Sequence, residues 1–308
     1  MRYATDHVTV TVPATAGNLG PGFDSLGMAM GVFDEVEVWA LGSPRVEIEI
    51  EGEGAESLPR DESHLIVRAI RAASDVVGVP HTGLRIVARN SIPHGKGLGS
   101  SAAAVVAGIA AVRGLLADPD ALDKETILRL ATEFEGHPDN AAPAIWGGAT
   151  VAWLDHEGAH AVPLDVAKGI ETAVLIPHAV LPTKQARALL PALVPHGDAA
   201  FNVGRAALLV AALSGHPERL WAATEDRLHQ GYRQSVMPSA AAMIAYLRER
   251  GLPAVVSGAG PSVLVIGTGL AAGGLVTGTP TWAEGIGGDS WRCVHTVGPV
   301  AGVAVVNG

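Results

Sequence analysis

Alternating hydrophobic and polar positions predict two strands early in the chain. Valines alternate with threonines over residues 8–12, and valine and isoleucine alternate with glutamates over residues 46–50. This period of two gives each strand one apolar and one polar face. Because strands with one face in water are typical of antiparallel or mixed sheets, we expect a sheet of that kind. A third strand is expected at residues 84–88.

Longer apolar runs predict two helices in the same half of the chain. Residues 101–116 are rich in alanine and valine and are apolar almost all round, which indicates a buried helix. Residues 124–135 predict a second helix, with Gly136 at the position of its C-cap. A strand is expected to follow at residues 148–153.

The pattern restarts after residues 163–169, and we therefore expect two domains, residues 1–165 and 166–308. Residues 269–288 are rich in glycine, threonine and alanine with little periodicity, so a loop or weakly ordered segment is expected there. The other elements expected in the second domain are strands at residues 172–176, 254–257 and 263–267, and helices after Thr183, at 199–213 and at 238–250.

Composition narrows the class of protein. The chain has 308 residues, 48% of them hydrophobic, and a formal net charge of -10 with scattered lysines and arginines, which excludes nucleic acid as a partner. The longest apolar stretch, residues 102–112, is shorter than the roughly 20 residues that cross a bilayer, so no membrane partner is expected. No signal sequence precedes the first strand, which favours a cytoplasmic location. Cys293 is the only cysteine, which excludes an intramolecular disulfide and any multi-cysteine metal cluster.

A glycine-rich segment precedes the first expected helix. Its glycines permit backbone torsions and close approaches that a side chain would prevent, and two serines then begin the helix. The N-terminus of a helix attracts anions such as phosphate, and Lys96 could add positive charge. The spacing matches neither the Walker loop nor the dinucleotide-binding fingerprint. The expected phosphate-binding residues are Pro93, His94, Gly95, Lys96, Gly97, Leu98, Gly99, Ser100, Ser101 and Ala102.

Three motifs resemble, in order, those of the GHMP kinases, a family that includes kinases of galactose, homoserine, mevalonate and phosphomevalonate. They are residues 13–24 (PATAGNLGPGFD), 93–103 (PHGKGLGSSAA) and 257–262 (SGAGPS). The resemblance implies an α+β fold in which an N-terminal ribosomal-protein-S5-domain-2-like domain is followed by a C-terminal ferredoxin-like α/β-plait domain. It also implies ATP with Mg²⁺ as the cofactor.

Residues 18–24 and 135–140 are similar to motifs of the homoserine-phosphorylating branch of this family. This implies ATP-dependent phosphorylation of the side-chain hydroxyl of L-homoserine to O-phospho-L-homoserine, in threonine biosynthesis. Galactokinase- and mevalonate-type members have an aspartate as the base where this chain has Asn140, so we expect Asn140 to orient the substrate rather than to remove its proton. Such kinases are often dimers, and a homodimer is expected. Two alternatives remain, a kinase for another small alcohol and a non-catalytic relative that binds a metabolite.

Magnesium requires hard oxygen ligands, such as a serine hydroxyl and a carboxylate. The resemblance implies a glutamate on a helix after the phosphate-binding segment, and Glu133 and Glu135 both qualify. We prefer Glu135 because it directly precedes the turn toward the substrate motif. Either Ser100 or Ser101 would supply the hydroxyl. The expected catalytic residues are Asn140, Glu135 and Ser100, and the last two are also the expected metal ligands.

Homoserine is a zwitterion, so its site needs cations for the carboxylate and an acceptor for the ammonium group. The resemblance implies that Arg187, one helical turn after Thr183, and Arg233 bind the carboxylate of the substrate. His64 stands where the family often has an asparagine, so the resemblance does not assign nucleobase contacts to this region. The residues implied in substrate binding are Asn18, Asp24 (facing the ammonium), His137, Asp139, Asn140, Thr183, Arg187, Arg233 and Gly260.

Overall fold

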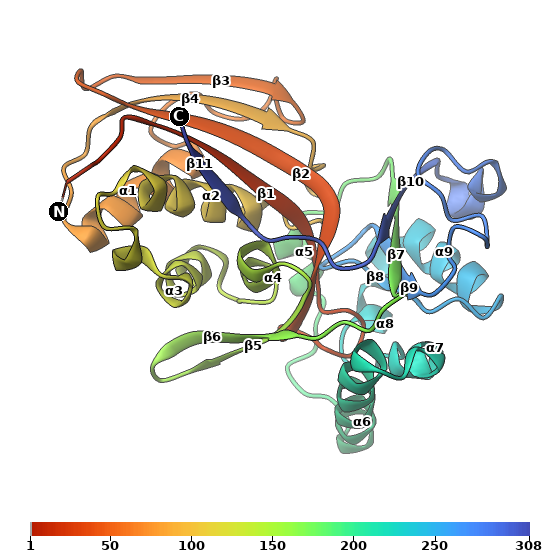
Figure 1. Ribbon diagram of the computed structural model, residues 1–308. Coiled ribbons are helices and arrows are strands. Elements are labelled where there is room, and N and C mark those ends of the chain that lie inside the picture. The colour runs from red at the N-terminus through yellow and green to blue at the C-terminus, as the bar shows by residue number, and fades with distance from the viewer. Residues whose placement is uncertain (1) are drawn as a thin grey trace.

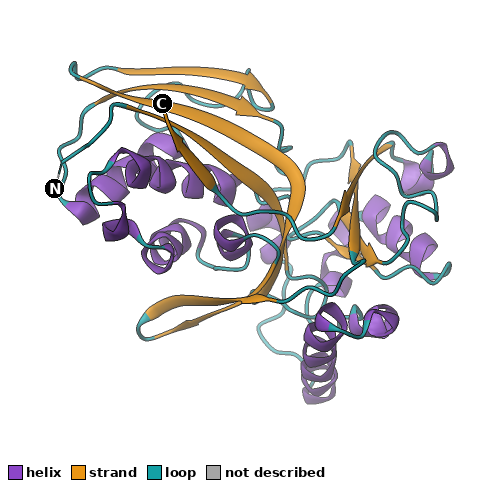
Figure 2. Ribbon diagram, in the orientation of Figure 1, coloured by secondary structure: helices purple, strands orange, loops and turns teal. Residues whose placement is uncertain are grey.

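The computed structural model describes residues 2–308 and contains two β-sheets, each with helices packed against it (Figure 1, Figure 2). The first sheet has the strand order β11-β1-β2-β4-β3, with β5 paired to β2 and β6 paired to β5. Its strands are β1 (His7–Gly17), β2 (Leu26–Leu41), β3 (Val46–Gly52), β4 (Gly83–Asn90), β5 (Ala149–Asp155), β6 (Gly158–Leu164) and β11 (Ala304–Asn307).

Four helices lie against one face of the first sheet, which arches over them in Figure 1. The central helix, α2, contacts α1, α3 and β1, and this explains why its sequence is apolar almost all round. The largest apolar core of the molecule fills the space between these helices and the sheet. The helices are α1 (Leu65–Val77), α2 (Ser100–Leu115), α3 (Lys124–Glu135) and α4 (Ala141–Trp146).

The second sheet has the order β10-β7-β9-β8 and packs against α9 around a smaller core. All of its neighbouring strands are antiparallel. After β10 the chain returns to the first sheet, where β11 pairs with β1. The elements here are β7 (Glu171–Pro177), α5 (Thr183–Arg187), α6 (His196–Ser214), α7 (Leu220–Ala223), α8 (Gln230–Arg233), α9 (Pro238–Arg248), β8 (Ala254–Val256), β9 (Val263–Gly267) and β10 (Trp291–Val297).

Most of the elements expected from the sequence are present. The first sheet is mixed, because β3 pairs parallel with β4 while β1, β2 and β4 pair antiparallel. Helices α2, α3, α6 and α9 confirm the four longer helices, and Gly136 is the C-cap of α3 with a φ of 79°. Residues 269–288 contain two short 3₁₀ helices and one isolated β-bridge, at Gly278, in agreement with the expected loop. The mixed α+β class is thereby confirmed.

The sequence patterns do not predict the strands β2, β6, β10 and β11 or the helices α1, α4, α7 and α8. The first five residues of β2, 26–30, are buried on both faces, so polar positions do not alternate with apolar ones there. The N-cap of α1 is His64, whose Nδ1 accepts the N–H of Ile66 at 3.2 Å, and histidine is not among the residues that usually mark a helix start.

The division of the chain near residue 165 stays a prediction. Strands β1 to β6 all belong to the first sheet, and β7 to β10 belong to the second. The last strand, β11 (residues 304–307), returns to the first sheet, so the two sheets do not correspond to two continuous halves of the chain. Within residues 2–308, every helix is too short or too polar to cross a bilayer.

Candidate active site

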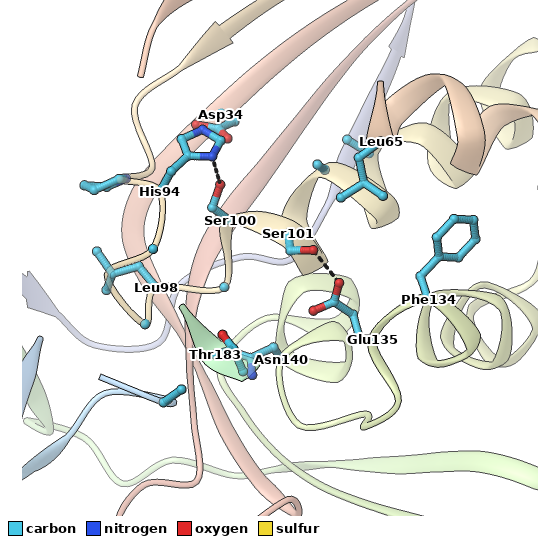
Figure 3. Close-up of a pocket in the computed structure, with 18 of the residues that line it drawn as sticks. Asp34, Leu65, His94, Leu98, Ser100, Ser101, Phe134, Glu135, Asn140 and Thr183 are labelled. Carbon is cyan, nitrogen blue, oxygen red and sulfur yellow. Dashed lines mark hydrogen bonds between the residues drawn. The ribbon is translucent and has the colours of Figure 1, made fainter. Parts of the chain in front are cut away.

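A cavity of about 690 Å³, here called the central cavity, lies where the glycine-rich segment, α1, the end of α3 and α5 meet. Figure 3 shows Leu65 and Phe134 at one end, Glu135 in the middle, and Asn140 with Thr183 beyond it. Its volume lies within the range of small-molecule sites. The side chains that line it are apolar at one end and polar at the other.

The phosphate loop, residues 93–101, forms one wall of the central cavity. Its glycines have left-handed backbone torsions, with φ of 65° at Gly95, 73° at Gly97 and 67° at Gly99. A Cβ atom on Gly97 would overlap the carbonyl oxygen of Ser257, so no residue with a side chain fits at this position. Helix α2 begins at Ser100 without a side-chain cap on its first N–H groups. These N–H groups and the helix dipole fit an anion such as phosphate.

Hydrogen bonds join the first and third sequence motifs to the phosphate loop. Nδ2 of Asn18 donates to the carbonyl oxygen of Gly258 at 2.8 Å, and the N–H of Gly258 donates to Gly17 at 3.1 Å. The Ser257 hydroxyl donates to the carbonyl oxygen of Gly97 at 2.7 Å. Segments far apart in the sequence therefore hold fixed positions around one cavity.

Asp139 is a buried carboxylate in the cavity wall, with 1% of its surface exposed. Its Oδ1 accepts from Nδ1 of His137 at 2.5 Å and from Nδ2 of Asn140 at 3.3 Å. Burial alone would lower the pKa of His137, but the hydrogen bond and the charge of Asp139 outweigh it and raise that pKa. Oδ2 of Asp139 is buried and has no hydrogen-bond partner within residues 2–308. Because buried carboxylate oxygens are normally paired, this atom fits a donor on a ligand.

Arg187 and Asp24 form an ion pair beside this carboxylate. Two guanidinium nitrogens donate to the two oxygens of Asp24, and this hydrogen bonding raises the pKa of Arg187. Asp24 does not itself line the cavity, but ligand atoms of Asp24, His137 and Asp139 lie within 4.8 Å of one another. The region therefore offers both negative and positive groups, as a zwitterion requires.

Arg233 lines the cavity and is only 1% exposed. Its Nη1 donates to Nδ1 of His229 at 3.2 Å, whereas its Nε is buried without a partner in the described chain. Burial, reinforced by the charge of Arg187, lowers the pKa of Arg233 to about 10. A buried guanidinium with an unused N–H fits an anionic group of a ligand.

The hydroxyl that meets Glu135 belongs to Ser101, which donates to Oε1 of Glu135 at 2.5 Å (Figure 3). The hydroxyl of Ser100 lies instead 3.3 Å from Nδ1 of His94. The expected pairing of Ser100 with Glu135 thus differs from the structure, because consecutive residues of a helix point in different directions. Glu133 is exposed and lies outside the cavity, which favours Glu135 over it. A hydroxyl and a carboxylate beside a phosphate-binding helix start fit Mg²⁺.

Three further residues expected at the site, Lys96, Ala102 and Gly260, do not line the cavity. Nζ of Lys96 donates to the carbonyl oxygens of residues 177–179 at 3.1, 2.5 and 2.7 Å, so its charge is already engaged away from the cavity. Ala102 is fully buried on the core side of α2, and Gly260 packs against Met237. Residues 258–259 line the cavity in place of Gly260.

Sequence analysis did not single out Lys184 or the apolar end of the cavity. Lys184 is exposed, lines the cavity and makes no ion pair within residues 2–308. Its position between Thr183 and Arg187 was a usable signal, because a short helix carries neighbouring residues to the same cavity. His64 also lines the cavity. Its Nδ1 accepts a backbone hydrogen bond, so its proton lies on Nε2, which is buried and has no partner in the described chain.

Comparisons with known proteins agree with this geometry. Residues 64–148 match the family model of the GHMP kinases N terminal domain. Homoserine kinase of Clavibacter michiganensis subsp. michiganensis is 52% identical over 261 residues, which is 85% of this chain and 83% of that protein. Homoserine kinase of Leifsonia xyli subsp. xyli is 51% identical over 281 residues, 89% of this chain and 87% of that protein.

A crystal structure of homoserine kinase from Cytophaga hutchinsonii has a TM-score of 0.86 and 26% identity, and the match covers 99% of each chain. The GHMP kinase fold expected from the three motifs is thereby confirmed. Identity of about half the residues over most of the chain goes beyond a shared fold, and this chain therefore belongs to the homoserine kinases of the GHMP kinase family.

Proposed function

We propose that this chain uses ATP to phosphorylate the side-chain hydroxyl of L-homoserine, giving O-phospho-L-homoserine and ADP as a step of threonine biosynthesis. One observation carries the proposal: a single cavity is lined both by a free helix start suited to phosphates and by a buried arginine, Arg233, and a buried carboxylate, Asp139. Phosphates need the first group, and a zwitterionic amino acid needs the second.

The phosphates of ATP would lie along the phosphate loop, against the first N–H groups of α2. Lys184 is a side-chain cation available to them, whereas Lys96 is held by carbonyl oxygens. The base would lie at the apolar end of the cavity near Leu65 and Phe134, where the buried Nε2–H of His64 can donate to it.

Glu135 and Ser101 would hold Mg²⁺ beside these phosphates. When bound, the metal ion supplies neutralisation of the negative charge on the phosphate oxygens. The carboxylate of Glu135 already accepts from the Ser101 hydroxyl, so both oxygen atoms are oriented before any ion arrives.

Homoserine would bind at the polar end of the cavity. Its carboxylate pairs with the guanidinium of Arg233, assisted by Arg187, in charge-assisted hydrogen bonds. Its ammonium group donates to Asp24 and to the unpaired Oδ2 of Asp139. This arrangement directs the side-chain hydroxyl toward Asn140 and the phosphate loop.

In the transfer step the hydroxyl oxygen attacks the γ-phosphorus. The bond between this phosphorus and the bridging oxygen breaks, its electron pair leaves with ADP, and the hydroxyl proton passes to a phosphoryl oxygen. Because the transition state is loose, the chain contributes mainly position and charge. Asn140 fits the positioning role, since it lines the cavity and is an amide that does not titrate.

The proposal is tested by measuring ADP release from the purified protein with L-homoserine, mevalonate, galactose and shikimate at saturating Mg²⁺. Release that depends on homoserine supports it, whereas a preference for another of these alcohols contradicts it. The absence of ADP with all four would favour a non-catalytic binding protein. The cytoplasmic location and the homodimer stay predictions.

A further inference from the structure

Thr15, near the end of β1, connects the phosphate loop to Asn140 although it does not line the cavity. It is fully buried, its N–H donates to the carbonyl oxygen of Leu98 at 3.0 Å, and its hydroxyl donates to Oδ1 of Asn140 at 3.0 Å. A Cβ atom on Gly99 would overlap the Thr15 hydroxyl and lie 3.1 Å from Oδ1 of Asn140. The phosphate loop therefore packs directly on this hydrogen bond.

The neighbours of Asn140 determine which atom of its amide faces the cavity. An asparagine amide has one accepting oxygen and one nitrogen with two donor hydrogens. Oδ1 accepts from Thr15, and Nδ2 donates to the carboxylate of Asp139 at 3.3 Å. A reversed amide would set its oxygen against that carboxylate, so that two acceptors would face each other. The Asp139 carboxylate, which can only accept, therefore selects the orientation, and the Thr15 hydroxyl then holds Oδ1 in place. This leaves the second hydrogen of Nδ2 for the cavity.

We propose that Thr15 is a positioning residue for phosphoryl transfer, whose hydroxyl fixes Asn140 so that Nδ2 donates to the oxygen of the substrate hydroxyl. A hydroxyl oxygen that accepts this hydrogen bond keeps its own proton free to pass to the phosphoryl group. Because Thr15 is also bonded to Leu98, it sets the position of Asn140 relative to the phosphates. This inference rests on the proposed function and adds to it the residue that orients the amide.

The test is a double-mutant cycle between Thr15 and Asn140. Thr15→Val removes the hydroxyl at nearly the same shape, and we expect kcat to fall about tenfold while both KM values stay within about twofold, since one orienting hydrogen bond is lost. Thr15→Ser retains the hydroxyl and should recover most of kcat. In the Asn140→Ala background, Thr15→Val should cause no further loss. Thr11→Val, on the same strand and outside the cavity, is the matched control.

Three results would overturn the inference. The first is a kcat of Thr15→Val equal to that of the parent protein, and the second is a fall in kcat from Thr15→Val that is as large in the Asn140→Ala background as in the parent. The third is a fall in kcat for Thr15→Ser as large as that for Thr15→Val. Thermal unfolding of each variant identifies a folding defect, and the Thr15→Ser result decides the matter if Thr15→Val does not fold. A parent protein that releases no ADP with homoserine would contradict the proposed function instead, so the two failures are distinguishable.

Discussion

Arg187 and Asp24, 163 residues apart in the sequence, form a two-point ion pair with nitrogen–oxygen distances of 3.0 and 2.5 Å. Their side chains are 33% and 34% exposed, so the pair contributes little to the stability of the fold. It does fix the planes of both charged groups beside Asp139. We infer that the pair is kept for the geometry of the substrate region rather than for stability.

Arg187→Lys is predicted to weaken homoserine binding, because an ammonium group cannot match a carboxylate at two points. We expect the KM for homoserine to rise about tenfold and the KM for ATP to stay within about twofold, in steady-state assays that vary each substrate. Arg205→Lys is the matched control, since Arg205 pairs with Glu225 at similar exposure outside the central cavity. An equal rise in both KM values for Arg187→Lys would remove this residue from the homoserine site.

Arg233→Met is predicted to separate binding from stability. Loss of a charge-assisted contact should raise the KM for homoserine between about 10-fold and 100-fold, with ATP binding nearly intact. Because burial lowers the pKa of Arg233 to about 10, its charge is costly in the folded protein, and the Tm without substrate should stay the same or rise. Arg227→Met, an exposed neighbour outside the cavity, should change neither KM. An unchanged homoserine KM in Arg233→Met would contradict the carboxylate assignment.

Glu135→Gln is predicted to raise the Mg²⁺ concentration needed for half-maximal activity about tenfold or more, because the amide loses the charge that a hard cation prefers. The measurement is a Mg²⁺ titration of ADP release at fixed ATP. Glu133→Gln, two residues earlier on α3 and exposed, should leave the titration unchanged. The assignment fails if the two variants respond to Mg²⁺ alike.

Asp34 should make stability depend on pH. It accepts the N–H groups of Ser91 and Ile92 at 2.7 and 2.9 Å just before the phosphate loop, and burial raises its pKa from 3.8 to about 6. The folded protein thus holds this proton more tightly than the unfolded chain, so stability falls as pH rises from about 4 through about 6. Asp34→Asn should therefore raise the Tm relative to the parent at about pH 8 and lose that advantage at about pH 4. A Tm difference that is the same at both pH values would contradict this.

Regular hydrophobic patterns were sufficient for much of the fold. Alternation predicts β3 and the first part of β1, a long apolar run predicts α2, and helical periodicity with a C-cap glycine predicts α3. These patterns do not predict β2, whose first five residues are buried on both faces, or β11, which has four residues and pairs with β1. A segment that is buried on both faces, or that is a strand only because it pairs with a distant one, has no alternation of apolar and polar residues.

Motifs identified the region of the site more readily than the directions of its side chains. Ser100 and Ser101 are adjacent, yet only the second meets Glu135. Lys96 lies within the phosphate loop but is turned toward carbonyl oxygens of a distant segment. Thr15 is part of the first motif, but its partner Asn140 lies 125 residues later. These contacts depend on the packing of separate segments, which one sequence does not encode locally.

The most direct test of the account is the identity of the phosphorylated product, followed by ³¹P NMR in a mixture of the protein, ATP, Mg²⁺ and L-homoserine. We predict a phosphate monoester signal coupled to the side-chain CH₂ of homoserine, growing in step with ADP and absent without homoserine. ADP accompanied only by inorganic phosphate, or an ester formed equally well with an alcohol that lacks the α-carboxylate, would contradict the account.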